Sequence, residues 1–222
     1  MTPPMPTIDT IEVADPPEAW RAAGFDVDDD ATCRVGGVRI RLVGRERGRR
    51  ILSWTLRDAT LASPDLDGLP TTASTAPPCE PARHPNGVLQ IDHVVLVTPD
   101  PARTTAALRA AGFEPRRTRH TDQYGPPFLQ VFFRAGEVIV ELIGPEEPSG
   151  DGPAAFFGLA YTVADLDATA ALLRDALGAP KAAVQPGRRI ATLRHKALGL
   201  SVPTAFLSPG PDALGREQGP AR

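Results

Sequence analysis

The sequence predicts an α+β protein, built from repeated β-α-β-β-β modules that pair into a curved, half-open, barrel-like sheet with helices on its outside. Residues 91–113 have the pattern of a strand followed by a helix, and residues 157–177 repeat that pattern further along the chain. A third copy opens the chain, where the segment Arg21–Phe25 is identical to Arg109–Phe113. Internal repeats decide an architecture before other signals do, so we expect modules of one kind.

The middle copy, residues 88–145, shows the module most clearly. A run rich in Val and Ile predicts a strand over Leu89–Val97, and Asp100 followed by Pro101 marks the start of a helix that Gly112 ends. A loosely alternating segment and a hairpin around Ala135–Gly136 complete the module. The expected strands are Phe113–His120, Phe128–Arg134 and Glu137–Ile143, with a turn at Tyr124–Pro127.

The other two copies follow the same order with weaker signals. In the third copy, residues 154–209, we expect a strand over Leu159–Val163, a helix over Leu166–Leu177, a weak strand at Ala182–Val184, and a hairpin of Arg189–Lys196 with Leu200–Leu207. The first copy, residues 1–60, is a degenerate module with a short helix. Its expected elements are a helix over Pro16–Ala23 and strands over Thr32–Val35, Val38–Val43 and Ile51–Leu56.

Two segments lack this pattern and define the domain organisation. Residues 61–87 are rich in proline without periodicity, so they are predicted to link the first module to a two-module domain over residues 88–209. The tail, residues 210–222, has little to pack against and is expected to be mobile. The middle and third copies are adjacent and form the natural pair. The first copy then either pairs with its equivalent in a second chain, giving a homodimer, or packs on the pair as an accessory.

Composition and charge exclude several classes of function. Hydrophobic residues make up 41% of the 222 residues and charged residues 23%, which is typical of a globular protein. A net charge of −3 gives no case for nucleic-acid binding, and no apolar run approaches the length that spans a membrane. The two cysteines, Cys33 and Cys79, make no disulfide framework, so a cytoplasmic location is expected.

Three segments carry a resemblance to a known family: Ile91–Val97, Phe132–Pro145 and Gly158–Asp167. Paired modules with a histidine in the first strand and a glutamate in the last resemble the vicinal oxygen chelate superfamily. That superfamily includes glyoxalase I, extradiol dioxygenases, epimerases, fosfomycin-resistance transferases and bleomycin-binding proteins. The resemblance covers residues 90–209 well and residues 7–57 more weakly. It implies that the partner is a small-molecule ligand, bound in the cavity of the curved sheet.

The resemblance also implies a metal site. Metalloenzymes of the superfamily hold a metal on side chains at matching positions of two paired modules, and the middle copy matches at His93 and Glu141. An imidazole and a carboxylate suit a divalent ion such as Fe, Mn, Co, Ni or Zn. Glu141 would serve as a ligand or as the catalytic base.

Strand alternation agrees with this assignment. His93, Val95 and Val97 share one face of their strand, because side chains alternate. A two-residue turn at Ala135–Gly136 would pair Phe132 with Ile139 and Gln130 with Glu141. Directly opposed residues project from the same face, so this hairpin is expected to look into the cavity beside His93.

The third copy departs from the family pattern. Gly158 stands where the middle copy has His93, and Ala205 stands where it has Glu141 if a slip of one residue is assumed. Two protein ligands are too few for a tight site, so the missing ligand would be His195, His120, Gln130, Tyr161 or a residue of another chain. Without a metal, His93 could hydrogen-bond a neighbouring carbonyl, and Glu141 could pair with His93 or face solvent.

Two functions therefore stay open. In the first, the chain is a metal-assisted lyase, isomerase or dioxygenase that acts on a substrate with two neighbouring oxygens, and an inward arginine holds a substrate carboxylate. In the second, it is a metal-free protein that binds or sequesters a small molecule, as the bleomycin-resistance members do. Substrate contacts are expected from Gln130, Phe132, Tyr161 and Arg194; the other arginines considered are Arg116, Arg117, Arg119, Arg188 and Arg189.

Overall fold

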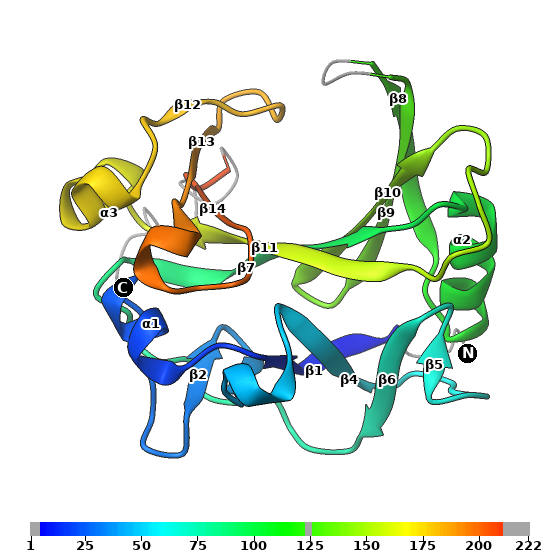
Figure 1. The fold of residues 1–222 in the computed structure, drawn as a ribbon, viewed down its shortest axis with the longest axis horizontal. Coiled ribbons are helices and arrows are strands. Elements are labelled where there is room, and N and C mark those ends of the chain that lie inside the picture. The colour runs from blue at the N-terminus through cyan, green and yellow to red at the C-terminus, as the bar shows by residue number, and fades with distance from the viewer. Residues whose placement is uncertain (1–4, 123–125, 211–222) are drawn as a thin grey trace, which may run out of the picture.

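The computed structural model describes residues 5–122 and 126–210, and their strands form two mixed sheets (Figure 1). The predicted α+β class with an open, curved sheet is confirmed. The smaller sheet and its helix comprise β1 (Thr7–Val13), α1 (Pro17–Ala22), β2 (Thr32–Val35), β3 (Val38–Leu42), β4 (Ile51–Arg57), β5 (Asp65–Leu66) and β6 (Leu69–Ser74). Of the tail predicted to be mobile, only Gly210 belongs to the described residues, and Tyr124 and Gly125 of the predicted turn also lie outside them.

The larger sheet contains the middle and third copies. Its middle copy comprises β7 (Val88–Val97), α2 (Pro101–Ala110), β8 (Pro115–Thr121), β9 (Phe128–Ala135) and β10 (Val138–Pro145). Its third copy comprises β11 (Ala155–Val163), α3 (Leu166–Leu173), β12 (Lys181–Ala182), β13 (Arg189–Thr192) and β14 (Thr204–Leu207). The strand orders are β2-β3-β1-β4-β6-β5 in the small sheet and β12-β13-β14-β11-β7-β10-β9-β8 in the large one.

Both sheets follow one plan. An antiparallel pair lies at the centre of each, β1 with β4 in the small sheet and β7 with β11 in the large one. Each central strand has on its other side a parallel strand that follows it in the chain: β3 beside β1, β6 beside β4, β10 beside β7 and β14 beside β11. The described chain therefore contains two pairs of modules, and the N-terminal pair is a shortened version of the other.

This plan corrects the sequence prediction for residues 51–87. The strand β4, expected to close the first module, opens a second short module that has no helix and continues through β5 and β6, inside the predicted linker. Without a helix, this module has no change of hydrophobic period that sequence reasoning could detect. The first copy thus completes its sheet within the chain rather than with a second chain, and its sheet packs on the large one as an accessory.

The helices begin at the aspartates that the repeats share. Asp100 accepts a hydrogen bond from the backbone N–H of Arg103 (2.9 Å) at the start of α2. Asp165 likewise accepts from the backbone N–H groups of Asp167 (2.8 Å) and Ala168 (3.1 Å) at the start of α3. Both are N-caps, which satisfy backbone donors that the first turn leaves unpaired. Among the described residues, no helix is long and apolar enough to cross a membrane.

The third copy contains two short 3-10 segments where longer elements were expected. The helix α3 ends at Leu173 rather than at Leu177, because Arg174 adopts a positive φ of 48° and a 3-10 turn follows. In the closing hairpin, β13 ends at Thr192 and β14 begins only at Thr204. A 3-10 helix over His195–Leu198 occupies the space between them.

The hairpin of β9 and β10 is displaced by two residues from its predicted register. Ala135 pairs with Val138, so the turn is Gly136–Glu137, and Phe132 opposes Glu141 instead of Ile139. Gly136 has a φ of 69°, which glycine adopts without strain. Because side chains alternate with a period of two, a shift of two preserves the faces, and Gln130, Phe132 and Glu141 still share one face.

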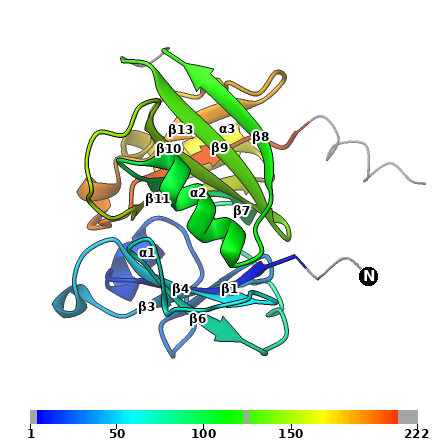
Figure 2. The same cartoon turned by 90° about the vertical axis from the view of Figure 1, so that its right-hand side faces the viewer.

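The small sheet packs against the convex side of the large sheet, whose two ends turn away from it (Figures 1 and 2). Aromatic side chains fill this interface. The ring of Trp54 on β4 lies 5.3 Å from that of Phe156 on β11, and the ring of Phe25 lies 5.1 Å from that of Tyr161. Burial of such large rings dominates the energetics of an interface, so one continuous core joins the two sheets.

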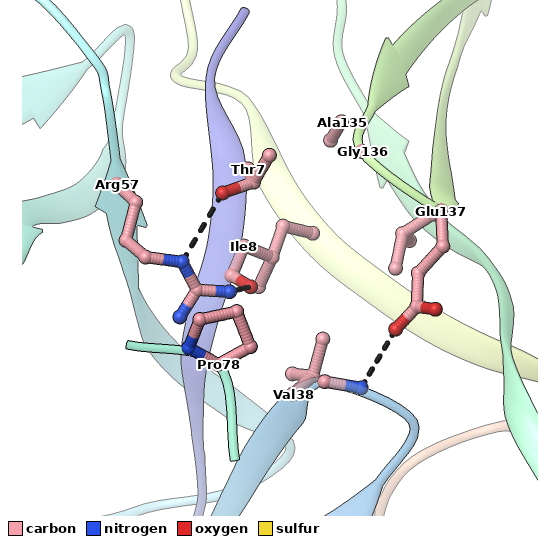
Figure 3. Close-up of a pocket in the computed structure, with 10 residues that line it drawn as sticks. Thr7, Ile8, Val38, Arg57, Pro78, Ala135, Gly136 and Glu137 are labelled. Atoms are coloured by element: carbon pink, nitrogen blue, oxygen red, sulfur yellow. Dashed lines mark hydrogen bonds between the residues drawn. The ribbon is translucent and has the colours of Figure 1, made fainter. Parts of the chain in front are cut away.

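A crevice of about 220 Å³ opens at one end of this interface, between β1 and the β9–β10 turn (Figure 3). Its charged groups already have partners. Arg57 donates to Thr7 Oγ1 (3.2 Å), to the carbonyl of Ile8 (2.9 Å) and to Asp9 (2.5 Å), while Glu137 accepts from the backbone N–H of Gly37 (2.7 Å). The Glu137 contact crosses between the sheets, so this crevice serves their packing.

His84, which follows the small sheet, is buried with 8% of its surface exposed. Its Nδ1 accepts the backbone N–H of Asp26 (3.0 Å), and its Nε2 lies 3.1 Å from the carbonyl oxygen of Arg34. This pattern assigns the single proton of the neutral ring to Nε2. Burial lowers the pKa of His84, because the charged ring would be desolvated.

We expect the free energy of unfolding to fall as the pH drops below about 6.5, the ordinary pKa of a histidine. In that range the unfolded chain gains a proton at His84 that the folded chain resists, because a proton on Nδ1 would face the N–H of Asp26. Thermal unfolding of wild type and His84→Ala, on both sides of this pH, measures the effect. The variant should lose part of the pH dependence, whereas His120→Ala, which alters an exposed histidine, should keep all of it.

Candidate functional site

The concave face of the large sheet carries a pocket of about 860 Å³. It lies between the two ends of the sheet that turn to the same side in Figure 1, with α2 and α3 outside them. Strands β7 to β10 form its floor and one wall, and the segment 183–186 with parts of β13 and β14 forms the other. The lining side chains include His93, Gln130, Phe132, Ile139, Glu141 and Val184.

The strand register arranges side chains in rows across the floor. Directly opposed residues project from one face of a sheet, so each row can be followed from β7 through β10 and β9. The first row is His93–Ile139–Arg134, the second is Val95–Glu141–Phe132–Arg117, and the third is Val97–Ile143–Gln130–Arg119. The last two rows end on β8, at the edge of the sheet. The pocket therefore has an apolar floor with an imidazole and a carboxylate, and a wall of arginines.

His93 and Glu141 converge on this floor. His93 Nε2 lies 3.5 Å from Glu141 Oε2, and both side chains are largely buried, with 20% and 11% of their surface exposed. The two residues occupy neighbouring rows on adjacent parallel strands, which explains why they meet although they are far apart in the sequence.

The second nitrogen of His93 is fixed by Asp92. His93 Nδ1 lies 2.9 Å from Asp92 Oδ1, and Asp92 Oδ2 accepts from Thr162 Oγ1 (2.9 Å) and from Arg188 (2.6 Å). Burial by itself would raise the pKa of the Asp92 carboxyl, but the hydrogen bonds from His93 and Arg188 outweigh it and hold this pKa well below its usual value. An ionised Asp92 therefore orients the ring so that Nε2 faces Glu141.

Asp92 reaches His93 because β7 bulges at this point. His93 pairs with Ala160 on β11 and Ile91 pairs with Tyr161, so Asp92 is an extra residue with no partner across the strands. A bulge bends its strand and redirects a side chain, and bulges are frequent beside functional sites. Sequence reasoning did not select Asp92. The signal available in the sequence was that Ile91–Asp92 repeats Ile8–Asp9. In the structure, Asp9 is likewise buried and pairs with arginines.

The third copy supplies no donor to this centre. Ala205 pairs with Ala160 as Glu141 pairs with Val95, which supports the one-residue slip assumed for the sequence alignment. At Gly158, the counterpart of His93, a Cβ atom would lie only 2.5 Å from the carbonyl oxygen of Pro203. No side chain fits there without moving the backbone, so the ligands of a symmetric site are missing from this half.

Arginines dominate the charge of the pocket. Arg116, Arg117, Arg119 and Arg134 line it, and Glu141 is the one acidic residue among the described lining residues. Guanidinium groups bind carboxylates and phosphates through paired, charge-assisted hydrogen bonds. The excess of positive charge therefore suits a negatively charged ligand. Sequence reasoning considered three of these arginines but did not assign them to substrate binding, because a strand with arginines on both faces does not reveal which face is covered.

The residues that sequence reasoning assigned to substrate binding are only partly brought together. Gln130 and Phe132 line the pocket as expected. Tyr161 does not, because it follows Ala160, which opposes His93, and therefore points to the convex side; it is fully buried between Phe25 and Phe206. Arg194 does not line the pocket either, because its strand has already ended at Thr192 and its side chain is exposed. The arginine near the centre is instead Arg188. It contacts Asp92, which in turn contacts His93.

The pair of His93 and Glu141 fits a divalent ion. Two atoms bound to one tetrahedral ion at about 2.0–2.2 Å lie roughly 3.4 Å from each other, close to the 3.5 Å observed. Because Nδ1–H donates to the Asp92 carboxylate, the lone pair of Nε2 faces the Glu141 carboxylate, and this arrangement suits a cation between them. Among the described residues, no group of three His, Cys, Asp or Glu side chains could hold an ion, so a third donor from these residues is of another type.

Comparison with known proteins agrees with the fold. Residues 92–192 match the family model described as the glyoxalase/bleomycin resistance protein/dioxygenase superfamily. This match confirms the predicted resemblance to vicinal oxygen chelate proteins. A search of curated proteins finds no match.

Solved structures with the same fold extend the similarity to the small sheet. A mutant of 4-hydroxymandelate synthase from Streptomyces coelicolor has a TM-score of 0.63 at 14% identity, and the match covers 97% of this chain and 100% of that one. A halotolerant catechol dioxygenase has a TM-score of 0.55 at 12% identity, covering 95% of this chain and 88% of that one. Methylmalonyl-CoA epimerase from Mycobacterium tuberculosis matches 58% of this chain and 93% of its own, with a TM-score of 0.46 at 19% identity. At these identities the likeness concerns the fold alone.

We expect Arg188→Ala to destabilise the protein by about 3–5 kcal/mol, because it leaves the buried Asp92 carboxylate without its charged partner. Only 9% of the Arg188 side chain and 8% of the Asp92 side chain are exposed. Denaturant unfolding measures the loss. Arg189→Ala is the matched control, since the adjacent Arg189 pairs with Asp167 at the surface and its loss should change stability little. Equal stabilities of the two variants would contradict the role given to Arg188.

Proposed function

We propose that the chain binds a small anionic molecule in the pocket of its large sheet and acts on it as an isomerase, lyase or dioxygenase assisted by a divalent metal ion. The observation that carries this proposal is the approach of His93 Nε2 to Glu141 Oε2, 3.5 Å apart on the floor of the pocket. The match of residues 92–192 to a family model named for glyoxalases and dioxygenases supports it.

The residues of the site would have different roles. His93 and Glu141 would hold the ion, and Asp92 would keep the imidazole in place. When bound, such an ion supplies Lewis acidity to substrate oxygens. Glu141 is the one carboxylate that lines the described part of the pocket, so it is the side chain able to take a proton from a bound substrate. Arg117 and Arg119, at the ends of the Glu141 and Gln130 rows, would bind a carboxylate or phosphate of the ligand.

A second candidate function, metal-free binding or sequestration of a small molecule, is favoured by a different observation. The third copy offers only Gly158 and Ala205 at the positions that correspond to the ligands, and both are too small to donate anything. In this case Glu141 and His93 would form an ion pair on the floor of the pocket. The two candidates differ in one measurable property, which is the affinity of the pocket for metal ions.

Measurement of metal binding distinguishes the two candidate functions. Protein stripped with EDTA should gain thermal stability on titration with Mn²⁺, Fe²⁺, Co²⁺, Ni²⁺ or Zn²⁺. An ion at a hundred times its Kd stabilises the folded state by about 2.7 kcal/mol, which raises the Tm by several degrees. His93→Ala and Glu141→Ala should abolish the rise, whereas His120→Ala, which alters an exposed histidine paired with Glu146, should retain it. A wild-type protein that responds to no ion would favour the metal-free function.

The arginine wall predicts affinity for anions independently of any metal. We expect pyrophosphate, titrated calorimetrically in the presence of EDTA, to bind the wild type and to bind Arg117→Ala about tenfold more weakly, since a charge-assisted pair is worth roughly 1.4 kcal/mol or more. Arg109→Ala, on the outer surface of α2, provides the control. If Arg117→Ala binds pyrophosphate as the wild type does, the wall does not hold the anion.

A further inference from the structure

The two donors on the floor of the pocket, His93 and Glu141, do not complete a metal site. Most candidates for a third donor are excluded by their positions. The third copy offers Ala205 and Gly158, and the carbonyl of Pro203 blocks a larger side chain at Gly158. Among the other candidates, His120 is exposed and bonded to Glu146, and Tyr161 is buried on the convex side of the sheet. His195 lies in the 3-10 helix that follows β13 and does not line the pocket.

Among the candidates within the described chain, Gln130 remains, and its environment differs from that of an ordinary glutamine. It lies on β9, in the row next to that of Glu141, and its Nε2 donates a hydrogen bond to Glu141 Oε1. Its Oε1 is buried and has no hydrogen-bond partner in the described part of the protein. A buried acceptor without a partner costs free energy of the order of 1–3 kcal/mol, so this oxygen calls for a partner that the described residues do not supply.

We propose that the carboxamide oxygen of Gln130 is the third protein donor to a divalent cation held by His93 and Glu141. This inference rests on the proposed metal-assisted function. The site would then draw all its donors from one module, on β7, β9 and β10, in place of the symmetric contribution of two modules. A cation also explains the orphaned oxygen, because it gives Gln130 Oε1 the partner it lacks while Nε2 continues to orient the Glu141 carboxylate.

The donor set determines the class of ion. One imidazole nitrogen, one carboxylate and one amide oxygen form a set rich in oxygen, without thiolate and with a single nitrogen. Such a set suits Mn²⁺, Fe²⁺ or Co²⁺, which accept several oxygen ligands, and it offers no preference for softer ions. The remaining coordination positions would face the pocket, toward the arginine wall where an anionic ligand is expected.

The test measures metal affinity directly, with Mn²⁺ followed by the electron paramagnetic resonance signal of the free ion and Co²⁺ by its visible absorption. Gln130→Ala should weaken binding of both ions on the order of 10- to 100-fold, as changes around metal centres commonly do. Gln130→Glu, which offers a carboxylate oxygen at the same place, should restore affinity. Gln90→Ala is the matched control, because Gln90 lies on β7 outside the pocket. Circular dichroism and thermal unfolding verify that each variant is folded.

The outcomes are distinguishable. If wild type binds Mn²⁺ or Co²⁺, and His93→Ala and Glu141→Ala lose the ion while Gln130→Ala keeps wild-type affinity, the role of Gln130 is overturned and the proposed function stands. If the wild type binds neither ion, both proposals fail. If Gln130→Glu binds Co²⁺ with a changed absorption spectrum while Gln90→Ala is unchanged, Gln130 contacts the ion rather than merely supporting the fold.

Discussion

The strands β7 and β10 run parallel and side by side, and their register brings His93 and Glu141 into adjacent rows on one face of the sheet. Pairing of residues 93–97 of β7 with residues 139–143 of β10 maintains that register, so the relative position of the two side chains does not depend on any loop. The other features of the pocket follow from the same pairing. Because β9 and β8 continue the rows, Gln130 and the arginines occupy fixed positions beside the pair.

Support for this sheet comes from the convex side. The small sheet covers β7 and β11 on this side, where Trp54 and Phe25 are buried and make aromatic contacts. Since both faces of the central strands are then engaged, one by the core and one by the pocket, these strands have little freedom to shift. The N-terminal pair has the same sheet plan with shorter strands, and one of its modules has no helix.

The repeats were sufficient to predict the middle and third modules and the start of α2 at Asp100, and strand alternation was sufficient to predict the common face of His93, Gln130 and Glu141. The last prediction held despite a wrong register, because the face of a strand residue depends only on a period of two. Other features depend on contacts that no local pattern contains. The bulge at Asp92, the reach of Arg188 from the segment before β13, and the pairing of β6 with β4 arise only when distant segments meet.

The contact between Gly158 and the Pro203 carbonyl makes the asymmetry of the large sheet a one-way change. A histidine could be accommodated at position 158 only if the segment ahead of β14 withdrew at the same time, since the space for its Cβ is already taken. A substitution at this position alone therefore cannot give the third copy a donor equivalent to His93.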